Sequence, residues 1–185
     1  MKKTLEIIGG PNGSGKSTFA KLHLGKRHGS LFVNSDSIAL GLTLNGNKYA
    51  QFEAGRTMLQ KIEKFLAENR SFGFETTLSG KIWTMYIRQA KTQGYKIILY
   101  FIYVNSIPLS LKRIKNRVKH GGHDIDKNIV KRRFKRTFLN FIGKYAPLAD
   151  EWYIIDNSNK GVEIAQMKNG KAKIFDEKKF EKYFS

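Results

Sequence analysis

The sequence predicts an α/β protein built on a parallel sheet with helices on both of its faces. Short apolar runs alternate with segments of helical periodicity as far as Ile155, a pattern typical of strand–helix–strand units. The run 95–104 is the most continuous, as expected of a strand buried on both faces of such a sheet. At 185 residues the chain is long enough for a sizeable core, and we expect a single domain over 1–185.

The first half of the chain predicts three strands, each followed by a helix. Ala54, Met58, Ile62 and Phe65 recur at helical spacing and indicate one of these helices. The segment 41–48 lacks such a pattern and is expected to be less regular. The strands are predicted over 5–9, 31–34 and 72–77, and the helices over 16–27, 50–68 and 81–93.

The second half predicts two further parallel strands, over 95–104 and 152–155, which complete a five-stranded parallel sheet. Ser106 is a candidate N-cap, with Pro108 in the first turn of the helix that follows. Gly121 and Gly122 interrupt that helix, and another is predicted over 126–144.

The tail follows a different pattern. Asn169 and Gly170 separate two strand-like segments, 162–168 and 171–175, and this dipeptide is a strong signal for a two-residue hairpin. A short amphipathic helix near Phe180 and Phe184 ends the chain. The region 161–185 is therefore predicted to be a C-terminal β-hairpin followed by a helix.

A phosphate-binding loop follows the first strand. Residues 10–17 match the Walker A pattern G-x-x-x-x-G-K-S and open a predicted helix. The glycines let successive N–H groups turn inward onto the α- and β-phosphates of a nucleotide, and the helix N-terminus adds attraction. The predicted nucleotide-binding residues are Gly10, Pro11, Asn12, Gly13, Ser14, Gly15, Lys16, Ser17 and Thr18.

Two of these side chains have a predicted chemical role. Lys16 is placed to neutralise the β- and γ-phosphates of ATP or GTP, and the Ser17 hydroxyl to bind Mg²⁺. The alternative, a glycine-rich turn that only joins a strand to a helix, does not explain the full eight-residue pattern. The motif does not distinguish a motor, a switch, a pump subunit and a small-molecule kinase.

Two carboxylates are expected near the phosphates, because ligands of an open parallel sheet bind beyond the carboxyl ends of its strands. Asp36 follows the second strand and is predicted to be a general base that accepts a hydroxyl proton. Its alternative role is an N-cap. Glu75 ends the third strand and is predicted either to orient the acceptor or to reach Mg²⁺ through water, the alternative being a carboxylate bonded to loop amides. No acid follows the strand that ends at Val104, where motor and switch proteins usually carry one.

The segment 112–136 is strongly basic, with eleven Lys or Arg and two Asp. Two cationic helices on either side of a glycine hinge predict a lid over about 117–131 that closes on the nucleotide. Arg117 is predicted to contact phosphates, and Arg132 and Arg133 to be catalytic. Since adjacent helical residues point about 100° apart, at most one of that pair aims at the phosphates. The alternative is a charged surface hairpin, in which His123 is a structural hydrogen-bonding residue.

Composition limits the partners of the protein. The formal net charge is +19, which favours polyanions, anionic membrane surfaces or phosphate-rich small substrates. The sequence has no cysteine, which excludes disulfides, thiolate metal sites and a cysteine nucleophile. No run approaches 18 apolar residues, and residues 1–4 lead directly into the first strand, so we expect a cytoplasmic protein without a membrane segment.

Five segments together resemble the zeta toxin family of small P-loop kinases. They are the Walker A loop, 33–36, 74–80, 121–125 with Arg132 and Arg133, and 156–158. The resemblance implies a nucleoside-kinase-like P-loop fold in which ATP or GTP phosphorylates a hydroxyl of a sugar nucleotide, UDP-N-acetylglucosamine in the best-known members. It also implies Asp36 as general base, Glu75 as acceptor-binding carboxylate, and an antitoxin protein as partner. The chain is shorter than the long zeta toxins, and the resemblance does not extend beyond about Gly161.

Two alternatives to a small-molecule kinase remain open from the residues. The net charge and the basic lid also suit a polynucleotide-end kinase, whose affinity would fall steeply with salt. A nucleotide-dependent module that docks RNA or a protein without catalysis would carry the same loop. The sequence does not select the acceptor or decide between ATP and GTP.

Overall fold

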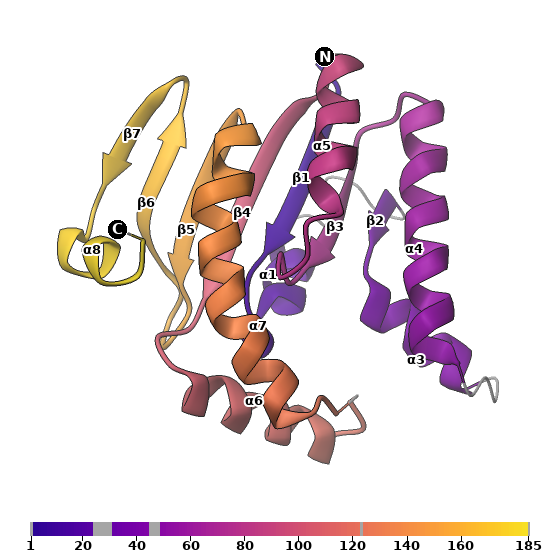
Figure 1. Ribbon diagram of the computed structural model, residues 1–185, viewed down its shortest axis with the longest axis vertical. Helices are drawn as coiled ribbons and strands as arrows, with labels where there is room; N and C mark the ends of the chain where they lie inside the picture. The colour runs from indigo at the N-terminus through magenta and orange to yellow at the C-terminus, as the bar shows by residue number, and fades with distance from the viewer. Residues whose placement is uncertain (1, 24–30, 45–48, 123, 185) are drawn as a thin grey trace.

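The computed structural model describes residues 2–23, 31–44, 49–122 and 124–184. Its centre is a sheet in the order β2-β3-β1-β4-β5-β6-β7 (Figure 1). The strands are β1 (Thr4–Gly9), β2 (Phe32–Val33), β3 (Phe72–Thr76), β4 (Lys96–Tyr103), β5 (Glu151–Asp156), β6 (Val162–Lys168) and β7 (Lys171–Ile174). The first five are parallel, whereas β6 pairs antiparallel with β5, and β7 with β6.

The α/β fold with its parallel sheet and C-terminal hairpin is thereby confirmed. The hairpin also extends the sheet to seven strands, because β6 pairs along the whole length of β5. The chain runs from β1 outward to β2 and β3 on one side and then to β4 and β5 on the other. Such a reversal of strand order beside β1 is where open α/β sheets bind ligands.

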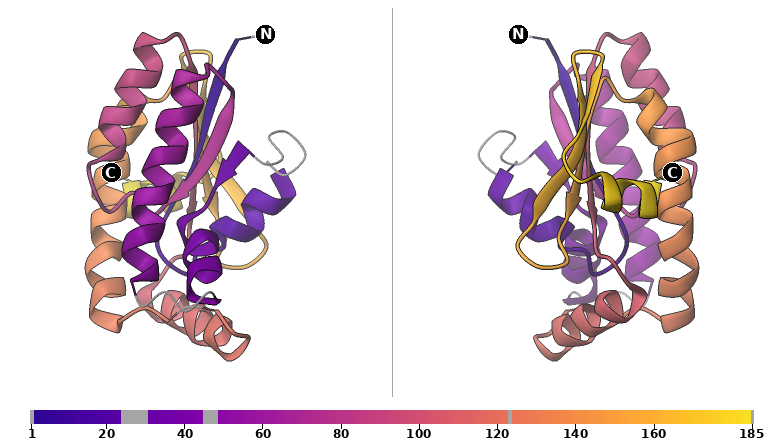
Figure 2. Two further views of the ribbon diagram at one scale, coloured as in Figure 1. Left: turned by 90° about the vertical axis from the view of Figure 1, so that its right-hand side faces the viewer. Right: turned by 90° about the vertical axis from the view of Figure 1, so that its left-hand side faces the viewer.

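Helices cover both faces of the sheet. They are α1 (Lys16–His23), α3 (Ser35–Leu44), α4 (Ala50–Ala67), α5 (Trp83–Thr92), α6 (Ile107–Lys119), α7 (Lys127–Asn140) and α8 (Glu177–Phe184). Helices α4, α5 and α7 lie on one face and α1 on the other, while α6 crosses the edge at which the parallel strands end (Figures 1 and 2). None of the helices in the described part of the chain is long and apolar enough to cross a membrane.

Two helix boundaries differ from the prediction, and a third lies outside the described residues. The segment expected to be irregular from residue 41 is helical as far as Leu44, because α3 continues through Gly41; residues 45–48 lie outside the described part. The helix predicted over 16–27 is described as far as His23, and residues 24–27 lie outside the described part. The helix predicted to reach residue 144 changes at Phe141 into one π-helical turn, Phe141–Tyr145, followed by a 3₁₀ turn, Ala146–Leu148.

The turn between α6 and α7 is built from local capping contacts. At the end of α6, Gly121 N–H donates to Val118 O and Gly122 N–H to Arg117 O, both at 3.0 Å, which is a Schellman motif with Gly121 at φ +81°. At the start of α7, the Asp126 carboxylate accepts N–H groups of the first turn at 2.8 and 3.2 Å. These caps fix where the chain leaves one basic helix and enters the other.

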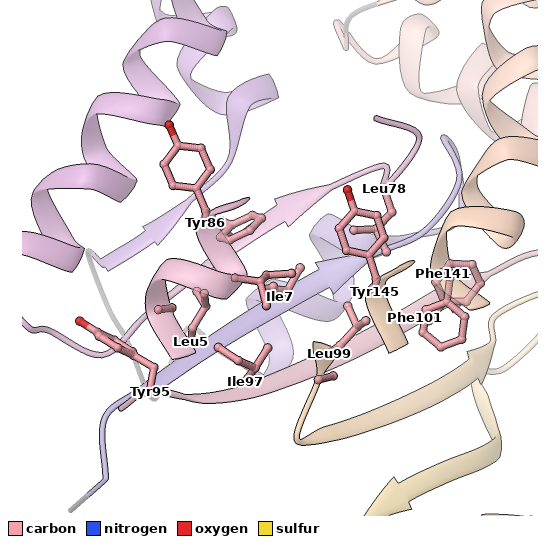
Figure 3. Packing of buried hydrophobic residues seen from close by; sticks show 14 of the residues in the cluster. Leu5, Ile7, Leu78, Tyr86, Tyr95, Ile97, Leu99, Phe101, Phe141 and Tyr145 are labelled. Carbon is pink, nitrogen blue, oxygen red and sulfur yellow. The ribbon is translucent and has the colours of Figure 1, made fainter. Parts of the chain in front are cut away.

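The core on the α5 and α7 side of the sheet is largely aromatic. Phe101 and Phe141 pack at a centroid distance of 4.3 Å, and Tyr145 and Leu78 are fully buried beside them (Figure 3). Phe184 of α8 meets the Phe101 ring edge-on at 5.6 Å. The C-terminal helix therefore belongs to the same core as the strands that carry the phosphate-binding loop.

Candidate active site

The loop between β1 and α1 has the shape of an anion cradle. Gly10, Gly13 and Gly15 have φ angles of +145°, +71° and +91°, which residues with a Cβ rarely adopt. A Cβ on Gly13 would lie 2.6 Å from the carbonyl oxygen of Ser110, and one on Gly10 would overlap the carbonyl of Ile102. Both the conformation and the neighbouring backbone therefore require glycine in this loop.

Two side chains outside the loop hold its carbonyl groups. Ser110 Oγ, on α6, donates to Asn12 O at 2.5 Å, and Asn157 Nδ2, after β5, donates to Ser14 O at 2.7 Å. In a planar trans peptide the N–H points opposite to the C=O. The two hydrogen bonds hold the carbonyls of Asn12 and Ser14 toward neighbouring elements. The N–H groups of Gly13 and Gly15 therefore point to the opposite side, where both glycines line a cavity.

Lys16, Ser17 and Glu75 meet beside the loop. Lys16 Nζ donates to Pro11 O at 2.9 Å and lies 3.9 Å from Glu75 Oε1. Ser17 Oγ donates to the same carboxylate oxygen at 3.2 Å. The side chains of Lys16 and Glu75 are only 7% and 10% exposed, so their charges act on each other with little screening by water.

Asn34 anchors Glu75 and also begins α3. Its Nδ2 donates to Glu75 Oε2 at 2.7 Å, while its Oδ1 accepts the N–H of Ser37 at 3.2 Å. The N-cap role considered for Asp36 thus belongs to Asn34, as expected for an Asn at the end of a strand and the start of a helix. Asp36 lies in the first turn of α3, and its side chain lies outside the described part of the structure.

A cavity of about 730 Å³ opens beside the loop. Of the residues predicted to form the site, those that line it are Asn12, Gly13, Gly15, Lys16, Ser17, Thr18, Glu75, Arg117 and Arg133. Gly10, Pro11 and Ser14 shape the loop without lining the cavity. Helices α6 and α7, the two cationic helices, are far from Lys16 in the sequence, but both reach the end of the sheet at which the parallel strands end (Figure 1). Arg133 therefore lines the same cavity as Lys16.

The two adjacent arginines of α7 occupy different environments. Arg133 is half-buried and lines the cavity, whereas Arg132 is exposed and does not line it. The separation follows from the roughly 100° between neighbouring residues of a helix. Arg117 also lines the cavity, and a Cβ on Gly122 would lie 2.5 Å from its Cγ, so the turn packs directly on this arginine. His123 lies outside the described residues.

One wall of the cavity is apolar, which the sequence did not predict. It is formed by Met58 of α4, Trp83 of α5, and Ile125 and Ile129 from the turn and the start of α7. The Trp83 ring packs at 4.9 Å from the ring of Phe74. No local pattern identifies these residues, because they come from three helices that are distant in sequence.

The strand order, the loop after the central strand and the carboxylate beside Ser17 define a P-loop protein with a kinase-like fold. The chain belongs to the zeta toxin family, whose model, "Zeta toxin", matches residues 1–179. An uncharacterized protein of Haemophilus influenzae is 34% identical over 125 residues, which cover 68% of this chain and 88% of that protein. The family resemblance is confirmed, and the match extends beyond Gly161 into the C-terminal region.

Solved structures share the fold. The AvrRxo1-ORF1:-ORF2 complex with ATP matches with a TM-score of 0.77 at 20% identity, over 100% of this chain and 64% of that one. A structure of the PezAT chromosomal toxin–antitoxin system of Streptococcus pneumoniae matches with a TM-score of 0.67 at 17% identity, over 87% of this chain and 70% of that one. The chain thus spans less than two thirds of the AvrRxo1 chain to which it is similar.

Proposed function

We propose that the protein is a kinase that transfers the γ-phosphate of ATP or GTP to a hydroxyl of a small anionic acceptor. The observation that carries this proposal is the convergence of Lys16, Ser17 and Glu75 with Arg117 and Arg133 on one cavity. Such a site has cations for both a phosphate donor and an anionic acceptor. Family membership favours a nucleotide sugar, such as UDP-N-acetylglucosamine, as that acceptor.

The donor half of the site is the P-loop. Its inward N–H groups and the N-terminus of α1 would bind the α- and β-phosphates, and Lys16 would neutralise charge at the β- and γ-phosphates. The AvrRxo1 neighbour was solved with ATP, which supports a nucleoside triphosphate as donor. A Cβ on Gly10 or Gly13 would meet neighbouring backbone, so glycine at these positions lets the loop adopt the bend that a phosphate cradle requires.

The residues beside Lys16 also fit Mg²⁺. The Ser17 hydroxyl and the Glu75 carboxylate offer hard oxygen atoms 3.2 Å apart at the start of α1, the ligand type that this ion prefers. Ser17 would hold the ion directly and Glu75 through water. When bound, Mg²⁺ supplies positive charge that offsets the charge of the phosphates.

The acceptor half of the site would activate a hydroxyl. We assign Asp36 as the general base, on the basis of its place in the first turn of α3, just beyond the end of β2. The acceptor oxygen forms a bond to the γ-phosphorus, the bond from that phosphorus to the β–γ bridging oxygen breaks, and the hydroxyl proton passes to Asp36. The nucleoside diphosphate is the leaving group, so atoms and charges balance.

The basic helices would complete the site. Arg133 and Arg117 are placed to stabilise the phosphoryl group in transfer, with 117–131 acting as the lid of a single kinase domain over 1–185. The apolar wall at Trp83 would pack against the uncharged part of the acceptor. The toxin–antitoxin system of the PezAT neighbour supports an antitoxin as a protein partner. We also propose that the enzyme acts in the cytoplasm.

One experiment tests this proposal. The protein is incubated with Mg²⁺, γ-labelled ATP and a metabolite extract, and labelled products are identified by mass. A labelled small anionic molecule supports the proposal, and an equal assay with γ-labelled GTP identifies the donor. Label at the ends of added RNA would instead indicate a polynucleotide-end kinase, and tight ATP binding without any labelled product would indicate a binding module.

A further inference from the structure

The turn after β5 contacts the phosphate-binding loop from outside the Walker A motif. Asn157 Nδ2 donates to Ser14 O at 2.7 Å, and a Cβ on Gly15 would overlap the same Nδ2 atom. Ser14 is fully buried, so loss of this bond would leave its carbonyl without water as a substitute. Because the Gly15 N–H belongs to the same peptide unit as the Ser14 carbonyl, Asn157 sets the direction of that N–H.

This turn is itself held by a buried carboxylate. Asp156 is 8% exposed, and its Oδ1 accepts the backbone N–H of Ser158 at 2.9 Å and the Ser158 hydroxyl at 2.5 Å. Burial opposes ionisation, but the hydrogen bonds from Ser158 and Lys179 outweigh it and hold the Asp156 pKa below its usual value. Asp156 is therefore a fixed anion one residue before Asn157.

The C-terminal helix supplies the cation for this carboxylate. Lys179 Nζ of α8 lies 3.0 Å from Asp156 Oδ2. The same helix is fastened to the end of β4, since the Tyr183 hydroxyl donates to Asn105 O at 3.2 Å. The right-hand view of Figure 2 shows α8 lying beside the sheet near its C-terminal hairpin, apart from α1 and the loop before it. A chain of contacts thus leads from Lys179 through Asp156 to Asn157 and the loop.

We propose that Asn157 is a positioning residue for nucleotide binding, and that Lys179 sets its position through Asp156. The C-terminal region would then tune how well the loop binds phosphates without touching the nucleotide itself. The inference rests on the nucleotide-binding half of the proposed function and not on phosphate transfer. It also assigns a role to the part of the chain farthest in sequence from the Walker A motif.

Calorimetric titration of the chain 1–185 with ADP and Mg²⁺ tests this inference. We expect Asn157→Ala to weaken ADP binding about fivefold, the equivalent of one hydrogen bond. Lys179→Ala should weaken it about threefold by the same reasoning, and Lys179→Arg should restore it because the guanidinium can still pair with Asp156. Lys178→Ala is the matched control, since Lys178 is an exposed lysine of the same helix, and should bind as the wild type does.

The outcomes separate positioning from simple stabilisation. Wild-type affinity in Asn157→Ala, or an equal loss in Lys178→Ala, would overturn the inference. If Asn157→Ala does not fold, the ADP affinities of Lys179→Ala and Lys179→Arg test the inference instead. A loss of affinity in Lys179→Ala that Lys179→Arg does not restore would also overturn the inference. A wild-type protein that binds ADP but transfers no phosphate would overturn only the kinase proposal, whereas one that binds no ADP would overturn both.

Discussion

Asn34 joins two neighbouring strand ends through one amide group. Its Nδ2 donates to Glu75 Oε2 at 2.7 Å and its Oδ1 accepts from Ser37 N at 3.2 Å. The start of α3 and the carboxylate beside the P-loop are therefore held by the same side chain. Because Asp36 lies between Asn34 and Ser37 in the chain, this amide also fixes the backbone that carries the proposed base relative to Glu75.

We expect Glu75→Gln to impair transfer while ADP binding persists. Glutamine keeps hydrogen-bonding atoms for Asn34 and Ser17 but removes the charge beside Lys16. We expect turnover to fall by about 10²-fold, and the Mg²⁺ concentration needed for half-maximal rate to rise, since a neutral amide is a weaker ligand for the ion's water shell. Steady-state rates measured over a Mg²⁺ series test this. An unchanged Mg²⁺ requirement would remove Glu75 from the metal site.

We expect Asp36→Asn to abolish transfer and leave nucleotide affinity intact. An amide cannot accept the hydroxyl proton, and loss of a general base costs about 10²-fold or more in rate. Turnover and ADP affinity should be measured on the same preparation. Ser37→Ala, at the exposed neighbouring side chain, is the control and should retain activity. Unchanged turnover in Asp36→Asn would show that another group takes the proton.

The two adjacent arginines of α7 allow a matched comparison. We expect Arg133→Gln to reduce turnover by about 10²-fold, because a cation that lines the cavity acts on the transferred charge. The exposed Arg132 is screened by water, so Arg132→Gln should change the rate less than about twofold. Turnover of both variants at the same ionic strength distinguishes them. Equal losses would show that general positive charge, rather than position, is what the site requires.

The sequence predicts best what depends on local pattern. The alternation of strands and helices, the Walker A loop and the N-cap at Ser106 all arise from residues close together in the chain. The hairpin was predicted from Asn169 and Gly170 in the same way. The pairing of this hairpin with β5, which makes the sheet seven-stranded, was not predicted. The local pattern does not show which strand lies at the edge of the parallel sheet.

What the sequence did not predict are contacts between distant segments. Asn157 and Ser14 are 143 residues apart, and Ser110 and Asn12 are 98 apart, so no spacing rule connects them. Asn34 carried a local signal as an N-cap, yet its bond to Glu75 depends on β2 lying beside β3. These partners become visible only when the parallel strands bring their carboxyl ends to one edge.

Two glycines should respond oppositely to alanine. Gly13→Ala should abolish ADP binding, because φ is +71° and the new Cβ would lie 2.6 Å from Ser110 O. Gly55 is exposed within α4 with no atom within 4 Å of a built Cβ, so Gly55→Ala should stabilise the protein by about 0.5–1 kcal/mol. Thermal unfolding should show a rise of roughly 1–4 °C for Gly55→Ala. Destabilisation by Gly55→Ala would indicate a hidden contact on α4.

Alkaline pH should unfold the protein through its buried tyrosines. Burial, together with the hydrogen bond that Tyr86 donates to Glu63 at 2.9 Å, raises the pKa of Tyr86 from 10.0 to about 12. Burial likewise raises the pKa of Tyr145 to about 12, and its hydroxyl donates to Gly80 O at 2.7 Å. The folded state therefore favours the protonated phenols, and their contribution to stability is complete below pH 10.

That contribution should be lost as the pH rises from about 10 to about 12, because the unfolded state releases these protons first. Denaturant unfolding at a series of pH values should show the free energy of unfolding falling across this interval. Tyr86→Phe removes one of the tyrosines whose pKa is raised, so the free energy of unfolding of the variant should fall less steeply with pH than that of the wild type. Parallel curves for the two proteins would show that Tyr86 ionises equally easily in the folded and unfolded states.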